Sequence, residues 1–330
     1  MPEGTLDRLA SKIEATWAAS GTWSDYIETM RRALPARTSD DHDQQGASRL
    51  KWVLIPNICC KGAGGDPEWA DEISLAWLLF NIAAHVFDSV EDMDKPDTWW
   101  QDTGPAAGLN AASGLFFTAS LALNRLYQSP AGAEAASAIN QRFYSQLMQM
   151  SAGQHLDLTL AYLTLEDYWK IASGKSGSFF SLASWAGARL VCRDGARLAG
   201  FAGYGHHFGM LVQLLDDLQD FQEIQNESDR VIEPKAITRS FASAYALDVL
   251  KGEERNRLEG LLGKLSTYPE AGTQIGGEAL EIIERCGAAL YLTIEVERHR
   301  DLAQAALERA QPASAERDQL VNLLPDLQSI

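Results

Sequence analysis

The sequence predicts an all-α protein, and three features of its 330 residues support this prediction. Several long segments follow a helical pattern, and one of them, 68–92, is rich in alanine and leucine and has no glycine or proline, which is typical of helices. Valine and isoleucine rarely alternate with polar residues, and no Asn-Gly or Asp-Gly turn separates such runs, so strands are poorly supported. Short polar or Pro/Gly-containing patches separate the helical segments. We therefore expect a single bundle of ten or more helices.

Six long segments carry the helical pattern most clearly: 68–92, 108–128, 133–164, 166–194, 197–224 and 278–310. The first of them is apolar nearly all round, which favours a helix in the middle of the bundle. Four patches are predicted to be loops: 35–47, 94–107, 225–237 and 267–277. None differs enough in composition to be an interdomain linker, so we expect one domain over 1–330. We divide it into an N-terminal helical segment and loop (1–45), a motif-bearing segment (46–245) and C-terminal helices (246–330).

The charge balance excludes some classes of partner. The chain has 28 Lys and Arg against 45 Asp and Glu, a formal net charge of −17. A surface this acidic repels phosphate backbones and anionic lipids, so we expect no nucleic-acid partner. It is compatible with a small phosphorylated substrate, because local cations or a bound metal can reverse the field inside one cleft. No uninterrupted apolar run approaches the ~20 residues of a membrane span, and acids stand where a signal peptide has its basic flank, so we expect a cytoplasmic protein without a membrane span.

Two clusters of acidic residues close apolar helical segments. In HVFDSVEDMD the side chains of Asp88, Glu91 and Asp92 share one helix face, because they are three and four residues apart. In LVQLLDDLQDFQE the corresponding acids are Asp216, Asp217 and Asp220. The spacing predicts that three carboxylates converge within one turn at each place.

Both clusters break the same local rules of helix stability. Like charges four residues apart destabilise a helix by a few tenths of a kcal/mol, and anions at its C-terminal end cost about 0.3–1 kcal/mol more. Solvated helix ends are the alternative interpretation, but two such violations favour a compensating ligand, and Mg²⁺ held by carboxylate oxygens is the natural candidate. Lys175, between two glycines, and Lys235, after the second cluster, add positive charge. Magnesium with lysines would make a site for a diphosphate.

At this point the sequence resembles the trans-isoprenyl diphosphate synthase (polyprenyl synthetase) superfamily over roughly residues 46–245. DSVED (88–92) and DDLQD (216–220) resemble its two DDxxD motifs, and GKSGSFF (174–180) resembles its KTGxLF segment. The resemblance implies the class I isoprenoid synthase fold, with helices around a central cavity, and a homodimer. It also implies about three Mg²⁺ ions on the two acidic motifs and an allylic prenyl diphosphate substrate. Lys175, Gln213 and Lys235 would contact the diphosphate.

The sequence also departs from that family. Ser89 replaces the second aspartate of the first motif, and the stretch MDKPDTWWQD (93–102) lacks the pair of arginines that binds isopentenyl diphosphate in the family. The upstream GKRxRP segment appears as ASRLKWV, with Ser48 and Trp52 at the positions of its first lysine and its proline. Losing two or three cations would cost several kcal/mol, because charge-assisted bonds contribute about 1.5–3 kcal/mol each. We therefore expect a crippled isopentenyl diphosphate site beside an intact allylic site.

These residues predict an enzyme that ionises an allylic diphosphate, and whose carbocation then reacts with something other than isopentenyl diphosphate. Our first expectation is a class I terpene synthase that cyclises or quenches the cation and releases diphosphate. One alternative is a chain-elongating isoprenyl diphosphate synthase with a degenerate isopentenyl site. Others are a transferase that moves the prenyl group to another acceptor, such as an indole ring, and a catalytically inactive subunit of a heteromeric synthase.

The expected cavity wall is apolar and aromatic, because aromatic faces stabilise carbocations. The candidates are Phe87, Phe116, Phe117, Phe179, Phe180, Trp185, Tyr204 and Phe208, although for any single one of them ordinary core packing is the more common role. In the resembling family, bulky residues just before the first motif shorten the product. Here Ala83 and Ala84 leave room for a long tail, which favours a farnesyl or geranylgeranyl substrate.

Overall fold

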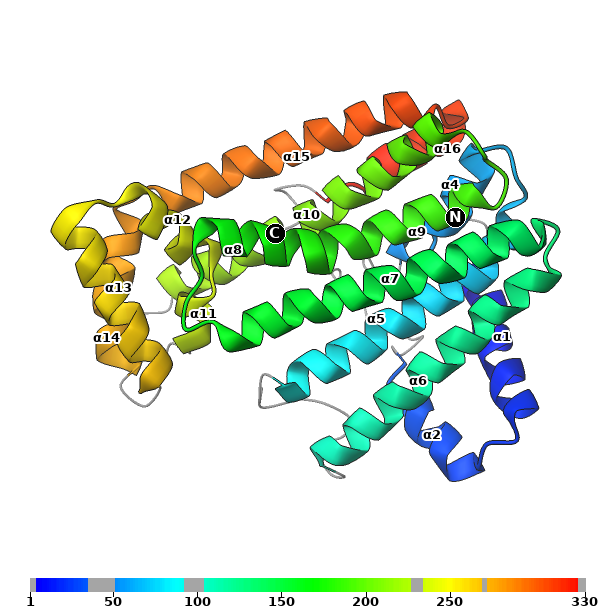
Figure 1. Ribbon diagram of the computed structural model, residues 1–330, viewed down its shortest axis with the longest axis horizontal. Coiled ribbons are helices and arrows are strands. Elements are labelled where there is room, and N and C mark those ends of the chain that lie inside the picture. Colours follow the sequence, from blue (N-terminus) through cyan, green and yellow to red (C-terminus); the bar gives the residue numbers. More distant parts are fainter. Residues whose placement is uncertain (1–3, 35–50, 92–103, 227–233, 269–271, 326–330) are drawn as a thin grey trace. The chain divides into compact units, whose positions relative to one another are not determined.

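The computed structural model describes residues 4–34, 51–91, 104–226, 234–268 and 272–325, and every long regular element in these ranges is a helix (Figure 1). The all-α prediction is therefore confirmed. The helices up to the middle of the chain are α1 (Thr5–Ser20), α2 (Ser24–Arg32), α4 (Ile55–Gly62), η1 (Pro67–Ala70), α5 (Asp71–Glu91), α6 (Pro105–Arg125), η2 (Leu126–Gln128) and α7 (Gly132–Thr159). Those that follow are α8 (Leu165–Ala172), the π-helical turn η3 (Ser173–Gly177), α9 (Ser178–Arg189), α10 (Gly195–Asn226), α11 (Pro234–Thr238), α12 (Phe241–Val249), α13 (Gly252–Thr267), α14 (Gly272–Glu284), α15 (Ala288–Ala310) and α16 (Ser314–Leu323).

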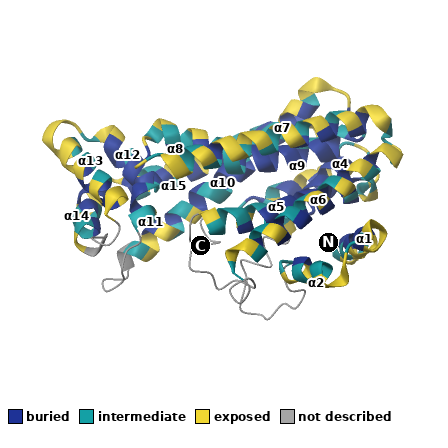
Figure 2. Ribbon diagram, turned by 60° about the horizontal axis from the view of Figure 1, so that its bottom comes forward, coloured by how far each residue is buried: buried dark blue, intermediate teal, exposed yellow. Residues whose placement is uncertain are grey.

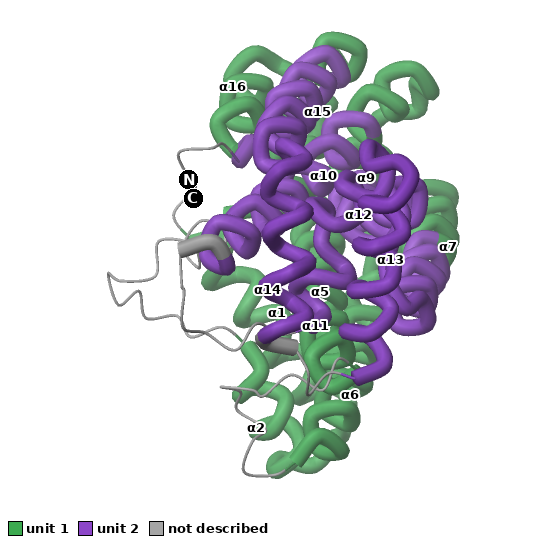
Figure 3. The backbone as a smooth tube through the Cα atoms, turned by 90° about the vertical axis from the view of Figure 1, so that its left-hand side faces the viewer, with its two compact units in different colours: residues 1–145, 182–202, 307–323 green, residues 146–181, 203–306, 324–330 purple. Residues whose placement is uncertain are grey.

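The chain divides into two compact units, coloured separately in Figure 3. Unit 1 comprises residues 1–145, 182–202 and 307–323, and unit 2 comprises residues 146–181, 203–306 and 324–330. Helices α7, α9 and α10 each begin in one unit and end in the other. The expectation of one domain over the whole chain stays a prediction.

Unit 1 is organised around α5 and α6, which pack against each other. Residues of α5 are mostly buried or half-buried (Figure 2), in agreement with an apolar segment in the middle of a bundle. Its buried acid Asp71 is satisfied by the guanidinium of Arg8, at 3.1 and 3.3 Å, and by the amide of Asn57 at 2.8 Å. A buried charge needs such partners, and these fix α1 on the start of α5.

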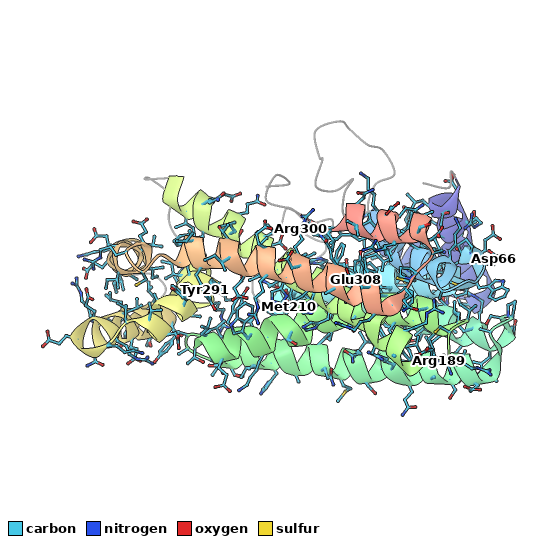
Figure 4. The ribbon with its side chains drawn as sticks, turned by 90° about the horizontal axis from the view of Figure 1, so that it is seen from above. Asp66, Arg189, Met210, Tyr291, Arg300 and Glu308 are labelled. Atoms are coloured by element: carbon cyan, nitrogen blue, oxygen red, sulfur yellow. The ribbon has the colours of Figure 1, made fainter. Side chains whose placement is uncertain are left out.

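Unit 2 has a core of its own. Helices α13 and α14 pack together around Leu258, Leu262 and Ile283, all of which are nearly inaccessible to solvent. Tyr291 of α15, labelled in Figure 4, stacks on Tyr245 of α12 with ring centroids 4.5 Å apart. Such aromatic pairs add about 0.5–1.5 kcal/mol beyond the burial of their area.

Several predicted element boundaries were wrong. The segment predicted as 133–164 stops at Thr159, and α8 starts anew after Thr164, which forms a reciprocal capping box with Asp167. The segment predicted as 166–194 contains the π-helical turn η3. The segment predicted as 278–310 is two helices separated at Gly287, whose φ of +75° is left-handed and ends a right-handed helix.

Three predicted loops are shorter than expected. In the loop predicted as 225–237, α10 continues to Asn226 and α11 begins at Pro234. Helix α6 already begins at Pro105, because proline is well tolerated in the first turn of a helix, and α14 already begins at Gly272. Residues 35–47 lie outside the described ranges.

Two stretches, Pro67–Glu91 and Pro105–Gln128, are long and apolar enough to cross a membrane by length and composition. The sequence analysis expected no such stretch. Half of each apolar window is buried inside the protein, and core helices of soluble proteins pass the same test.

Candidate active site

The second acidic cluster lies near the C-terminal end of α10, in unit 2. Asp216 and Asp220 are exposed, whereas Asp217 is half-buried and its carboxylate accepts a hydrogen bond from the hydroxyl of Tyr168 on α8. Burial, together with the negative charges of Asp220 and Asp216, raises the pKa of Asp217 to about 7, although the hydrogen bonds from Tyr168 and Gln213 act in the opposite direction. Burial also raises the pKa of Asp220, with Glu223 adding to the effect. A bound cation would stabilise the ionised form of such a carboxyl group and lower its pKa again.

Tyr168 is the partner of Asp217 that sequence reasoning missed. Its side chain is 4% exposed, and burial next to Asp217 raises the pKa of the phenol well above its ordinary value. The hydroxyl therefore stays protonated and donates, so it fixes the orientation of one carboxylate oxygen of Asp217. Nothing in the local spacing signals this pair, because 49 residues separate its members.

The π-helical turn η3 lies directly against α10. A Cβ atom added to Gly209 would meet the carbonyl oxygen of Ser176 at 2.1 Å, so only glycine permits this approach. The hydroxyl of Ser176 then donates to Oε1 of Gln213 at 3.0 Å. Gln213 is also bonded to Asp217, so one hydrogen-bonded run joins Ser176, Gln213, Asp217 and Tyr168. Single π-helical turns often mark functional sites, and this one presents Lys175 beside that run.

Lys175 is held by polar groups of α7. Its ammonium donates to Oε1 of Gln154 at 2.6 Å and lies 3.6 Å from Oδ2 of Asp157. Arg239, just after α11, donates to the other oxygen of Asp157 at 2.9 Å. Among the described residues, Nε2 of Gln154 is one of two buried side-chain polar atoms without a hydrogen-bond partner. A buried amide N–H without an acceptor beside an ammonium group fits an anionic ligand at this place.

We expected no role for Gln154, Asp157 or Arg239 from the sequence. The segment AGQHLDL (152–158) resembles a segment of the polyprenyl synthetase superfamily, and this resemblance was a usable signal for the first two. Lys235, which the sequence predicted, lies half-buried on α11, and the backbone N–H of Arg239 donates to its carbonyl oxygen at 3.0 Å. Lys175, Gln213, Asp217 and the helix that carries Lys235 therefore all belong to unit 2.

The first acidic cluster ends α5, in unit 1. Asp88 is half-buried and Glu91 is exposed, and Asp92 lies outside the described residues. One turn earlier, Ala83 is 1% exposed and Ala84 is half-buried. The two acidic clusters belong to different units, so their joint action stays a prediction.

The predicted aromatic wall residues take part in packing within each unit. In unit 1, Phe116 packs edge-on against Phe80 with ring centroids 4.7 Å apart, and Phe87 is half-buried. In unit 2, Phe179, Phe180 and Phe208 are at most 5% exposed, and the last two stack at 4.9 Å. Their contact with a prenyl chain stays a prediction.

The metal ligands are not assembled among the described residues, where no three His, Cys, Asp or Glu side chains converge closely enough to hold an ion. The convergence of Asp216, Asp217 and Asp220 on one ion therefore stays a prediction: Asp217 accepts the hydrogen bond from Tyr168, and the other two acids are exposed. The donor type nevertheless fits Mg²⁺, which binds through one or two carboxylates and keeps other positions for water or phosphate oxygens.

A cavity of about 450 Å³ lies beside the π-helical turn within unit 2. Its lining is polar apart from one glycine, and consists of Gln146, Gln149, Lys170, Ser173, Gly174, Ser178, Ser181 and His206. Prenyl tails require apolar walls, so this cavity does not match the predicted tail pocket.

The chain is similar to known proteins that are named as isoprenyl diphosphate synthases or as prenyltransferases. The polyprenyl synthetase family model matches residues 51–275, which is more than half of the chain. The chain is 26% identical over 139 residues to the tryptophan prenyltransferase ComQ of Bacillus subtilis subsp. natto, covering 42% of this chain and 41% of that protein. It is 23% identical over 270 residues to a short chain isoprenyl diphosphate synthase of Methanothermobacter thermautotrophicus, covering 78% and 79% of the two chains.

Similarity to solved structures extends over almost the whole length. The geranylgeranyl pyrophosphate synthetase of Pyrococcus horikoshii matches with a TM-score of 0.71 at 18% identity, covering 97% of each chain. This likeness confirms the predicted isoprenoid synthase fold. Together with the family match over residues 51–275, it leads to one conclusion. The chain belongs to the polyprenyl synthetase family.

Proposed function

We propose that this protein is a prenyltransferase that ionises an allylic prenyl diphosphate and transfers the prenyl group to an uncharged acceptor such as an indole ring. The observation that carries the proposal is the hydrogen-bonded run in unit 2 from Ser176 through Gln213 and Asp217 to Tyr168, with Lys175 beside it. The run contains the amide of Gln213 and the carboxylate of Asp217, and Lys175 precedes Ser176 in the chain; these are the groups that recognition of a magnesium-bound diphosphate requires.

Each part of the site has a proposed role. The proposed magnesium ligands are Asp88, Glu91, Asp92, Asp216, Asp217 and Asp220. When bound, Mg²⁺ neutralises the negative charge that develops on the leaving diphosphate. Lys175, Gln213 and Lys235 bind diphosphate oxygens and orient the substrate. Tyr168 keeps the carboxylate of Asp217 in place, as its hydrogen bond supports.

The proposed reaction breaks the bond between C1 of the allyl group and the diphosphate oxygen, and both electrons leave with the diphosphate. The π electrons of the acceptor ring then form a bond to C1, and the ring loses one proton. Small residues before the first acidic cluster, Ala83 and Ala84, support a farnesyl or geranylgeranyl substrate. The aromatic side chains proposed as the wall that excludes water are Phe87, Phe116, Phe179, Phe180 and Phe208.

The nature of the acceptor is proposed from the cations that the sequence lacks. Ser48, which stands at the position of a lysine, and the arginine-free stretch 93–102 remove positive charge that would bind isopentenyl diphosphate. The name of one relative, a tryptophan prenyltransferase, supports an aromatic acceptor. The other relatives compared are named as diphosphate synthases, so chain elongation is the outcome to be tested against it.

A class I terpene synthase is the second candidate, and the same missing cations favour it. With no acceptor bound, the double bonds of the prenyl chain or a water molecule would attack the cation. The resemblance also implies a homodimer, which light scattering on the purified protein would test.

One experiment separates these functions. The purified protein is incubated with Mg²⁺ and geranylgeranyl or farnesyl diphosphate, alone, with isopentenyl diphosphate, or with tryptophan or indole. Prenylated indole supports our proposal, longer diphosphates support elongation, and hydrocarbon or terpene alcohol from the single substrate supports the cyclase. Asp216→Asn should remove every activity, whereas Asp248→Asn, an exposed acid of α12, serves as the matched control. Wild-type protein that releases no diphosphate in any mixture would overturn the proposal.

A further inference from the structure

Arg239 shares the carboxylate of Asp157 with Lys175, and this shared carboxylate is the basis of our inference. Nη1 of Arg239 lies 2.9 Å from Oδ1, and Nζ of Lys175 lies 3.6 Å from Oδ2. The three side chains are between 18% and 25% exposed, so water screens their charges only in part. The shorter distance makes Arg239 the stronger partner of Asp157.

Arg239 also holds the segment that follows α7. Its Nη2 donates to the carbonyl oxygen of Leu160 at 3.0 Å, one residue after the helix ends. Close by, the backbone N–H of Leu163 donates to the carbonyl oxygen of Thr238, the last residue of α11, at 3.2 Å. These bonds tie the end of α7 to α11, the helix that carries Lys235 (Figure 1).

We propose that Arg239 is a positioning residue that neutralises Asp157 and so leaves the positive charge of Lys175 available to the substrate diphosphate. With Arg239 present, the three side chains carry one net positive charge. Without it, Asp157 and Lys175 cancel, and the ammonium is drawn toward the carboxylate because no other cation is described on that carboxylate. The inference rests on the proposed function, since it assigns Lys175 to the diphosphate.

The test measures binding of inorganic diphosphate in the presence of Mg²⁺ by calorimetry, together with kcat and KM for geranylgeranyl diphosphate. Arg239→Gln, which removes the charge but keeps hydrogen-bond donors, should raise the dissociation constant of diphosphate about tenfold, as expected for one charge-assisted bond. Arg239→Lys should recover most of the affinity. Arg257→Gln, which removes an arginine exposed on α13 and paired with Glu278, is the matched control and should bind like wild type.

A double variant distinguishes the charge effect from a structural one. Asp157→Asn in the Arg239→Gln background removes the carboxylate that would cancel the charge of Lys175, and so restores one net positive charge. Diphosphate affinity should therefore return to within about threefold of wild type. A double variant as weak as Arg239→Gln, or a single variant that binds like wild type, would overturn the inference. Failure of the wild type to bind diphosphate or turn over would instead overturn the proposed function.

Discussion

Replacing Gly209 by alanine tests how the π-helical turn packs on α10. The new Cβ would lie 2.1 Å from the carbonyl oxygen of Ser176, 2.5 Å from its carbonyl carbon and 2.9 Å from the nitrogen of Gly177. All three atoms belong to the backbone, so no side-chain rotation can relieve the clash. The π-helical turn must move away from α10, and the bond of 3.0 Å between Ser176 and Gln213 must lengthen or break.

The size of the effect follows from these contacts. Overpacking of a well-packed site costs about 1–3 kcal/mol, and a clash with backbone atoms at 2.1 Å belongs at the upper end of that range. The entropy of unfolding is about 2.1 cal/mol/K per residue, or roughly 0.7 kcal/mol/K for 330 residues. A loss of about 3 kcal/mol should therefore lower Tm by about 4 °C. Substrate affinity should fall as well, because Lys175 lies in the displaced turn.

Calorimetry and steady-state kinetics on Gly209→Ala provide the assay, and Gly260→Ala on α13 is the matched control. A Cβ added to Gly260 meets nothing within 4 Å, so this variant should be stabilised by about 0.4–1 kcal/mol and should keep its activity. If Gly209→Ala melted within about one degree of wild type and kept its KM, the described packing of the turn on α10 would be refuted.

Three further predictions concern the site and its surroundings. Tyr168→Phe should raise the Mg²⁺ concentration for half-maximal turnover about tenfold, because Asp217 loses the bond that orients it; an unchanged Mg²⁺ titration would contradict this role. Burial lowers the pKa of His299 to about 4 from its ordinary 6.5, so at this residue the unfolded chain takes up the proton first, and His299 by itself should lower stability by on the order of 3 kcal/mol as pH drops from 6.5 to 4, relative to a variant without it. Urea unfolding across this range should show the slope, and His299→Gln should lose it; an equal slope in both proteins would refute it. Asp216→Ala and Asp88→Ala should each abolish turnover while leaving Tm unchanged or raised, because like-charge repulsion is relieved, and a large drop of Tm in both would mark them as structural.

The fold was predictable because a long apolar helix can be recognised from the residues of its own segment. An alanine- and leucine-rich run without glycine or proline predicted α5 closely, and the helical pattern of 197–224 predicted α10 closely. The break between α14 and α15 was missed, because Gly287 looks like any helical glycine until its positive φ is known. The π-helical turn was also missed, since it depends on the close approach of Gly209 to Ser176 from another helix.

The candidate site was predictable only where its chemistry is local. The acids of α10 stand four residues apart, so spacing alone predicted that Asp216 and Asp220 share a helix face. Pairs that join distant residues escaped, because Tyr168 is 49 residues from Asp217 and Arg239 is 82 residues from Asp157. The convergence of the three carboxylates on an ion stays a prediction, and the bond that Asp217 accepts from the buried Tyr168 could not be foreseen from spacing within α10.

The central claim is that this protein cleaves the bond between an allylic prenyl group and its diphosphate. The most direct measurement is diphosphate released from geranylgeranyl diphosphate, with Mg²⁺ and with a chelator, by the wild type and by Asp216→Asn. The account predicts many molecules of diphosphate per wild-type protein with Mg²⁺, and none with the chelator or the variant. Equal release by wild type and Asp216→Asn, or no release by wild type with any acceptor or prenyl chain length, would contradict it.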